Sequence, residues 1–462
     1  MHRPRPTRLA ALALALATAF AATGCGTGSL APGRTRVEPA DTLTMWTFKQ
    51  THVAALEQAA AAFRRQTGVT VTITAYTPDD AFSSKLESAA ATGQLADVIE
   101  VHAGGEDRTL GGAQIADDLS KDFTSAQLAA FLPGTAEAGR ITPAVQQASL
   151  APQATDPGVR VGQLFSVPLT AGTFGIVYAD RAQLTAAGLD PAHPPTTWQQ
   201  FVAWLAAVHR HDPRHGGLTV GLRTSSTAFQ WLLEPLAYAD LGAQRYHALF
   251  GKNPDTDWAG PDGQAVLRLY DQITPYWQPG TQSLGIDDAD RAFAQGKAAF
   301  DLGGTFTLAS VRQDGMRADQ VVAFPVPAPA GGAARTLRLA PIALTGLTVT
   351  TSSPHKAAAL AWIRFLTSPQ QAAAFARASL DLPATDLGAA TANVVGPQAA
   401  ALEQAFGPPG PDTYTPNDTT FKPPAEDDEQ LGDVLVRLSP LRESTAAAAA
   451  RQLGTLTTDD WK

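Results

Sequence analysis

The feature that most constrains the fold is an alternation of strand and helix patterns near the start of the chain. Three β-type runs are separated by two helix patterns, in the order 43–46, 52–66, 69–74, 83–92 and 97–101. The first helix pattern has apolar side chains at the i, i+3, i+4 and i+7 spacing of an amphipathic helix. Gly68 follows it, where a left-handed C-cap is expected. This alternation predicts an α/β fold with a parallel sheet and right-handed crossovers.

The rest of the chain adds further extended segments and helices. Apolar extended segments at residues 165–179 and 321–329 are candidates for linkers between two lobes. Further helix patterns occur at residues 196–209, 265–274, 355–366 and 369–378. The Pro- and Asp-rich segment 407–429 is expected to form a long surface loop. The helix pattern of residues 431–453 must break or kink at Pro440.

The N-terminus has the pattern of a secretion signal. Three arginines precede an apolar run at residues 9–22, which is too short to span a bilayer. Ala22-Thr23-Gly24-Cys25 resembles the bacterial lipobox. We therefore expect a signal peptide at 1–24, a lipid anchor on Cys25 and a tether at 25–40, placing the protein on the extracytoplasmic face of the cell membrane. Cys25 is the only cysteine in 462 residues, so no intramolecular disulfide can form.

Charge and motifs exclude several classes of function. The net charge is −9, which becomes −12 once the three arginines leave with residues 1–24, so nucleic acid is not an expected partner. The sequence has no His-Glu-x-x-His, Walker or Gly-x-Ser-x-Gly motif. His211 and His215 are separated by Pro213, which disfavours the helix that a metal pair would need. We predict no catalytic residue, no metal site and no cofactor.

Five ordered segments between residues 43 and 384 carry a family resemblance. They are Leu43-Thr44-Met45-Trp46 with Phe63 to Gly68, Gly93-Gln94-Leu95-Ala96-Asp97-Val98, Val167-Pro168 with Gly175 to Asp180 and Pro194-Pro195-Thr196-Thr197-Trp198, Ala292-Phe293-Ala294-Gln295-Gly296-Lys297 with Gly303-Gly304-Thr305-Phe306, and Ala361-Trp362 to Pro369 with Leu382-Pro383-Ala384. Together they resemble the family-1 extracellular solute-binding proteins, which include maltose-binding protein.

The resemblance implies a two-lobed α/β clamshell of the type II periplasmic-binding-protein kind, with a hinge between the lobes. We expect an N-terminal lobe at 41–170 plus 326–371 and a C-terminal lobe at 171–325 plus 372–462. Such a protein would act as a monomer, capture a sugar, expected to be an oligosaccharide, and deliver it to an ABC permease in the membrane. The alternatives are a receptor for another polar solute, a receptor for a sensor kinase, and a secreted glycoside hydrolase, which needs two carboxylates facing each other across a cleft.

Candidate ligand contacts follow from the chemistry of sugars, whose C–H faces pack on aromatic rings and whose hydroxyls pair with polar groups. The candidates are Trp46, Phe48, Lys49, Gln50, Asp107, Arg108, Thr173, Phe174, Phe229, Trp231, Thr305 and Phe306. Asp107-Arg108 resembles the Asp-Arg pair of the family, and Phe306 takes the place of a tryptophan that stacks on the sugar in relatives. Burial in the core is the alternative for Trp46 and Trp231, and a solvated loop is the alternative for Asp107-Arg108.

Overall fold

The computed structural model describes residues 42–462 except 153, 404–405, 408–412 and 417. The predicted signal peptide, the tether and the lipidation site Cys25 lie outside the described residues. Among the helices that are described, none has both the length and the apolar character needed to cross a membrane.

The first sheet confirms the predicted strand and helix alternation. Its five strands, in the order β2-β1-β3-β10-β4, are Thr70–Ala75, Thr42–Thr47, Val98–His102, Ile342–Val349 and Val167–Gly172. β1 is parallel to both β2 and β3, whereas β10 runs antiparallel to β3 and β4. The crossovers are α1 (Val53–Thr67) and α2 (Asp79–Thr92). Gly68 ends α1 with a φ of 83°, the left-handed C-cap that the sequence predicts.

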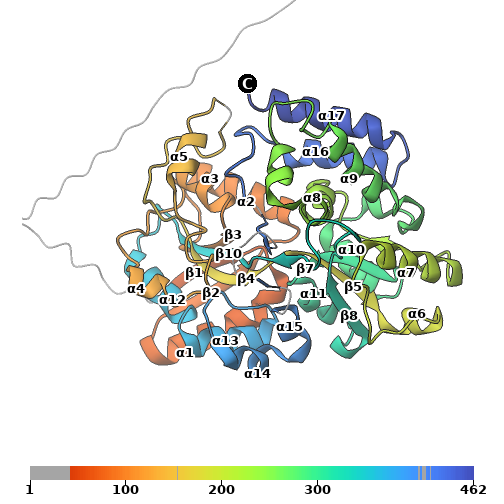
Figure 1. Cartoon of the computed structure of the whole chain (residues 1–462). Coiled ribbons are helices and arrows are strands. Elements are labelled where there is room, and N and C mark those ends of the chain that lie inside the picture. Colours follow the sequence, from red (N-terminus) through yellow and green to blue (C-terminus); the bar gives the residue numbers. More distant parts are fainter. Residues whose placement is uncertain (1–41, 153, 404–405, 408–412, 417) are drawn as a thin grey trace, which may run out of the picture. The chain divides into compact units, whose positions relative to one another are not determined.

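Helices cover both faces of the first sheet (Figure 1). One face packs against α1, α12 (Lys356–Leu366) and α13 (Pro369–Ser379), and the other packs against α2 and α3 (Glu106–Gly112). Successive strand residues point to opposite faces, so Met45 belongs to the first cluster of apolar side chains and Trp46 to the second. We call the first sheet and these helices the first lobe.

The second sheet has four strands and defines the second lobe. In the order β6-β7-β5-β8, its strands are Leu218–Thr219, Phe300–Gly304, Phe174–Asp180 and Val321–Pro325. β5 is antiparallel to β7 and β8, and β6 is parallel to β7. The helix α7 (Trp198–His211) packs Phe201 against this sheet. Thr197 caps α7 by accepting a hydrogen bond from the backbone N–H of Gln200 at 3.3 Å.

The chain passes between the two sheets more than once. β4 ends at Gly172 and β5 begins at Phe174, and after β8 the chain returns through residues 326–341 to β10. After α13, Leu382 and Ala384 form backbone hydrogen bonds of 2.9 and 3.0 Å along β4. The lobe boundaries stay predictions, and this pairing favours a return to the second lobe after Ala384 rather than after residue 371.

The C-terminal region packs on the second lobe. The C-terminal helices are α16 (Asp428–Leu438) and α17 (Ala446–Asp459), which pack against each other. α17 packs against α9 (Pro261–Asp271), which in turn contacts α8 (Glu234–Ala248) in the second lobe. The break between α16 and α17 falls at Pro440, as predicted. The prediction of a surface loop over 407–429 is wrong in part, because Tyr414 and Lys422 are buried against Glu234 of α8.

The remaining elements are short. They are α4 (Ser125–Leu128), α5 (Pro143–Ala148), α6 (Arg181–Ala186), α10 (Ile286–Ala294), α11 (Thr307–Gln313), α14 (Thr391–Val395), α15 (Pro397–Leu402), β9 (Arg338–Leu339), β11 (Thr413–Tyr414), η1 (Gln50–His52), η2 (Ala228–Leu233), η3 (Thr274–Tyr276), η4 (Thr281–Ser283), η5 (Ala318–Gln320) and η6 (Gly388–Ala390). Of these, η1, η2, α10 and α11 contribute to the site described next.

Candidate ligand-binding cleft

A cleft of about 830 Å³ lies between the two lobes. Its first-lobe wall follows the ends of β1, β2 and β3 and includes β10, with Phe48, Lys49, Gln50, Thr51, Thr77, Pro78, His102, Leu344 and Thr345. The second-lobe wall consists of Phe174, Arg223, Thr224, Ser226, Thr227, Gln230, Trp231, Gly285, Ile286, Asp287, Asp288, Arg291, Phe306, Ser310, Gln313 and Asp314. The carboxyl ends of parallel strands are where α/β folds bind ligands. The volume lies within the range of about 300–1,000 Å³ that is usual for small-molecule sites.

Three aromatic rings form one part of the second-lobe wall. Phe174 and Trp231 stack with their ring centroids 5.2 Å apart and their planes 12° apart. Phe306 meets both rings edge-on, at 6.4 Å from Phe174 and 5.8 Å from Trp231. All three residues were predicted ligand contacts, and the fold brings them together from β5, η2 and the turn before α11. We call these three residues the aromatic wall.

Lys49 reaches from the first-lobe wall to the aromatic wall. Its ammonium lies 4.3 Å from the ring centroid of Phe306 and 5.9 Å from that of Phe48. Phe48 in turn stacks on His102, with the ring centroids 4.1 Å apart. The contact between Lys49 and Phe306 is a cation–π interaction that joins the two walls. The ammonium of Lys49 thus covers one face of the Phe306 ring.

Charged side chains line the cleft beside the aromatic wall. Asp288 lies 3.7 Å from Arg223 and 3.0 Å from Arg291, and Arg291 lies 3.6 Å from Asp314. These groups are partly exposed, so each pair contributes little to stability. Guanidinium and carboxylate groups in such a position can form charge-assisted hydrogen bonds with a polar ligand.

The C-terminal region supports the second-lobe wall from behind. Gln230, which lines the cleft, donates a hydrogen bond to Asp428 at 2.5 Å. Ser225 and Ser226 donate hydrogen bonds to the carboxylate of Glu429 at 2.7 and 2.8 Å. Residues at the start of α16 therefore hold the cleft segment that includes Gln230, although they are far from it in the sequence.

Several predicted contacts lie outside the cleft. Trp46 is buried in the first lobe, where it packs edge-on against Tyr76 at 5.2 Å and under the ammonium of Lys85. Asp107 is fully buried and accepts a hydrogen bond from the hydroxyl of Ser166 at 2.5 Å. Burial raises the pKa of Asp107 against the opposing effect of this hydrogen bond. Arg108, the next residue on α3, is not part of either cleft wall.

The remaining predicted contacts lie behind the cleft. Thr173 and Thr305 are buried where the chain passes between the lobes, and the backbone N–H of Thr173 donates to the hydroxyl of Thr305 at 3.3 Å. Phe229 is completely buried between Phe250 and Trp258 in the core of the second lobe. Phe48, Lys49, Gln50 and the aromatic wall are thus the predicted contacts that the fold brings to the cleft.

Several residues of the cleft carried no sequence signal. Arg223 follows a two-residue strand and lies in an irregular segment, so no periodic pattern marks it. Asp287 and Asp288 are adjacent acids in the first turn of α10, and both line the cleft. No helix is predicted at this position from the sequence, so these two acids were not among the candidates.

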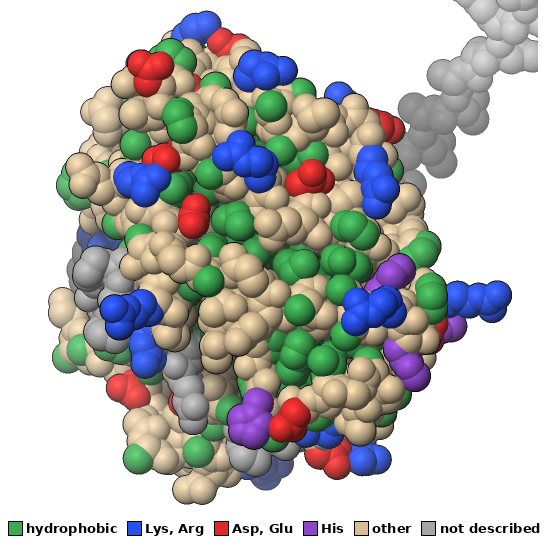
Figure 2. Space-filling model, turned by 45° about the vertical axis from the view of Figure 1, so that its right-hand side comes forward, with side chains coloured by type: hydrophobic (Ala, Val, Ile, Leu, Met, Phe, Trp, Pro, Cys, Tyr) green, Lys and Arg blue, Asp and Glu red, His purple; other side chains and the backbone are tan. Residues whose placement is uncertain are grey.

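The acids that line the cleft belong to one of its two walls. Asp287, Asp288 and Asp314 all belong to the second-lobe wall, and the described residues of the first-lobe wall include no carboxylate. On the face of the molecule shown in Figure 2, basic and acidic side chains are dispersed among each other, and that face has no continuous basic patch.

Solved structures share this fold over nearly the whole of their length. They include maltose-bound MalE3 of T. maritima, 18% identical with a TM-score of 0.68, over 90% of this chain and 99% of that chain. The Thermus thermophilus maltotriose binding protein bound with maltotriose is 18% identical, with a TM-score of 0.64 and coverages of 90% and 99%. A Thermotoga Lettingae ABC transporter solute binding protein bound with α-D-tagatose is 18% identical, with a TM-score of 0.66 and coverages of 91% and 100%. These similarities confirm the predicted two-lobed, periplasmic-binding-protein-like α/β fold.

Sequence comparison supplies the family. A search of curated protein sequences finds no significant match. A family model described as bacterial extracellular solute-binding protein matches residues 58–401, which include strands of both sheets, the second-lobe wall of the cleft and part of its first-lobe wall. The chain therefore belongs to the bacterial extracellular solute-binding protein family.

Proposed function

We propose that the protein is the substrate-binding component of an ABC importer and that it captures a sugar, an oligosaccharide, in the cleft between its lobes. The observation that carries this proposal is the aromatic wall of Phe174, Trp231 and Phe306 beside partly exposed arginine and aspartate side chains. Aromatic rings pack on the C–H faces of sugar rings, and charged groups bond to their hydroxyls. The sugars bound in the maltose and maltotriose structures support the same class of ligand.

Delivery would depend on closure of the lobes. A ligand that touches both walls binds the closed state better than the open state and shifts the population toward closure. The closed protein would then dock, as a monomer, on a permease in the membrane. We further propose that a lipid on Cys25 holds the protein on the extracytoplasmic face of the membrane.

A thermal-shift screen over mono- and oligosaccharides, with amino acids and short peptides included for comparison, tests the proposed function. A ligand that binds only the folded state at about 100 times its Kd stabilises that state by about 2.7 kcal/mol. We expect the melting temperature to rise with an oligosaccharide and the sugar to be recovered intact. Release of shorter sugars would instead support a hydrolase, and a response only to amino acids or peptides would contradict the proposal.

Phe306→Leu is expected to weaken binding of the sugar identified in that screen by about fivefold, which corresponds to the loss of about 1 kcal/mol of aromatic contact. Leucine keeps an apolar side chain at this nearly buried position but removes the ring face. Isothermal calorimetry measures the change, and Tyr276→Leu, an aromatic residue outside the cleft walls, is the matched control. Equal affinities of Phe306→Leu and wild type would place the ligand elsewhere.

A further inference from the structure

We propose that His52 is a positioning residue for the cleft, because its ring joins the turn that carries Lys49, Gln50 and Thr51 to the segment that pairs with β4. The inference deepens the proposed function, on which it rests for the role of the cleft. His52 itself does not line the cleft and is completely buried at the end of η1.

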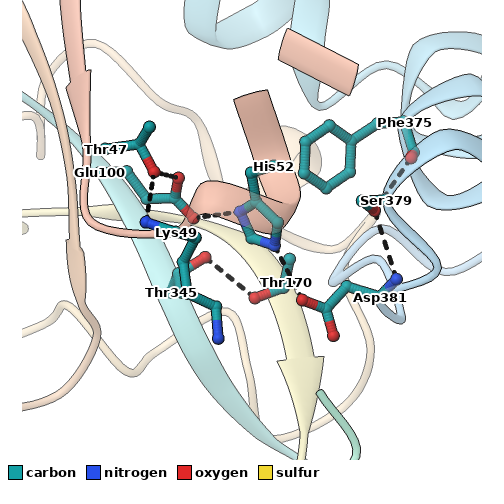
Figure 3. Close-up of polar contacts among 9 residues, drawn as sticks. All are labelled: Thr47, Lys49, His52, Glu100, Thr170, Thr345, Phe375, Ser379 and Asp381. Carbon is teal, nitrogen blue, oxygen red and sulfur yellow. Dashed lines mark hydrogen bonds and ion pairs between the residues drawn. The ribbon is translucent and has the colours of Figure 1, made fainter. Parts of the chain in front are cut away.

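The ring of His52 lies between two carboxylates (Figure 3). Its Nδ1 is 2.8 Å from Oε1 of Glu100, and its Nε2 is 2.7 Å from Oδ2 of Asp381. Neither carboxylate is exposed beyond 1%, and Phe375 packs edge-on against the ring at 5.0 Å. Ionised carboxylates only accept hydrogen bonds, so both ring nitrogens must carry a proton to satisfy both contacts. The geometry therefore points to a buried imidazolium.

Burial alone would lower the pKa of His52. The charge of Glu100 and hydrogen bonds with Asp381 and Glu100 outweigh burial and raise the pKa to about 9. Burial would likewise raise the pKa of Glu100, but the positive charge of His52 keeps it below its usual value. His52 and Glu100 thus stabilise each other in their charged forms.

The three groups come from different parts of the first lobe. Glu100 lies in β3, and Asp381 follows α13 and directly precedes the segment that pairs with β4. β4 is the strand from which the chain passes to the second lobe at Thr173. The imidazolium therefore connects the middle of β3 with the start of the segment that pairs with β4.

A second set of hydrogen bonds leads from Glu100 to the cleft. Its Oε2 accepts a hydrogen bond of 2.6 Å from the hydroxyl of Thr47, which in turn accepts one of 2.9 Å from the backbone N–H of Lys49. Figure 3 shows this series from His52 to Lys49. The ammonium that rests on Phe306 thus belongs to a residue whose backbone is fixed through Glu100 and His52.

This arrangement is suited to positioning and not to catalysis. Both ring nitrogens contact carboxylates, so neither is available to take a proton from a nucleophile. The ring also has no exposed surface. The contacts link three segments of the chain in the interior of the lobe. Removal of one charge from a buried ion pair is strongly destabilising, because the other charge is left without a partner.

The reactivity of Lys49 tests the proposal without a ligand. In His52→Gln, the amide can satisfy only one carboxylate as a donor, so we expect Lys49 to be acetylated by N-acetoxysuccinimide about threefold faster or more, because local opening increases. Mass spectrometry reads each lysine separately, and exposed Lys252 serves as the internal reference. Amide hydrogen exchange over residues 47–53 is expected to increase in parallel.

Glu234→Gln is the matched control, since it alters a fully buried carboxyl in the second lobe. It is expected to lower the melting temperature without changing the acetylation rate of Lys49. An unchanged Lys49 rate in His52→Gln, or equal changes in both variants, would overturn the proposal. If His52→Gln does not fold, ¹⁵N-histidine NMR of the wild-type protein at pH 8 decides, because a neutral His52 ring would also overturn it. Failure of every sugar to bind would reject the proposed function and leave these results unaffected.

Discussion

Replacing Lys422 by methionine is expected to lower the free energy of unfolding by about 3–5 kcal/mol near pH 8, because buried carboxylates lose their cation. The ammonium of Lys422 lies 2.7 Å from Glu234 and 2.8 Å from Glu426, and its side chain is only 4% exposed. It also lies over the rings of Phe229 and Phe250, at 5.6 and 4.9 Å from their centroids. Methionine retains the flexible apolar stem, so the loss reports mainly on the charge.

The loss of stability in this variant is expected to shrink as the pH falls. Burial raises the pKa of Glu234 and of Glu426 even with the lysine present, and removal of the lysine raises both further. A carboxyl whose folded pKa is raised gives stability that is complete below its unfolded pKa and is lost as the pH rises through the folded pKa. The variant should therefore be closest to wild type near pH 5.

Urea unfolding at about pH 5 and about pH 8 measures this difference. Lys252→Met is the control, because its exposed ammonium only rests on Trp461, and we expect a change below about 0.5 kcal/mol. A loss of equal size at both pH values would show that Lys422 stabilises the region through packing and not through charge.

Asp301→Asn is expected to make the protein more stable than wild type at alkaline pH. Asp290 in α10 and Asp301 in β7 are both buried, and their carboxyl groups contact each other. Among the described residues, Oδ2 of Asp290 and both oxygens of Asp301 have no partner that donates a hydrogen. The pair is therefore satisfied only when one carboxyl is protonated and donates to the other.

The pH dependence follows from these pKa values. Burial raises the pKa of Asp290 to about 7, and burial together with the charge of Asp290 raises the pKa of Asp301 well above its usual value. Both folded pKa values are raised, so the stability that the pair allows at acidic pH begins to be lost as the pH rises through about 7, where Asp290 loses its proton, and is lost further as Asp301 loses its proton. Asparagine donates a hydrogen bond without titrating, which leaves one carboxylate with a permanent donor.

We expect Asp301→Asn to exceed wild type by about 2 kcal/mol near pH 9 and to show a flatter dependence on pH. Melting curves between about pH 5 and pH 9 measure this, with Asp255→Asn on the surface as the control. His52 also loses its proton near pH 9, but it does so in both proteins, so the difference between them isolates the acid pair. A wild-type protein that is equally stable at both ends of the range would contradict the assignment of a shared proton.

The elements that could be predicted are those with a periodic signal. Residues 43–101 alternate between periods of 2 and 3.6, and β1 to β3 with α1 and α2 follow that pattern closely. Pro440 also marked its helix break correctly, because proline removes a donor wherever it lies. Local rules sufficed for these features.

The site was harder to predict because burial depends on distant partners. Asp107 resembles a ligand contact by its position in the sequence. In the fold it is buried and accepts a hydrogen bond from Ser166, which lies 59 residues away in the chain. Lys422 lies in a segment whose composition indicates a surface loop, and only the acids around Glu234 explain its burial. Phe229 and Trp231 are two residues apart, but one packs in the core and the other faces the cleft, because η2 turns them to different sides.

The position of β10 has a consequence for the order in which the protein forms during synthesis. β10 lies between β3 and β4 in the first sheet, yet residues 342–349 are made after every strand of the second sheet. Until they emerge, β3 and β4 have unpaired edges, and Trp362 and Phe375, which cover one face of the sheet, do not yet exist. The sheet that is begun first is therefore completed last. A growing chain of this design keeps its first sheet open until late in its synthesis.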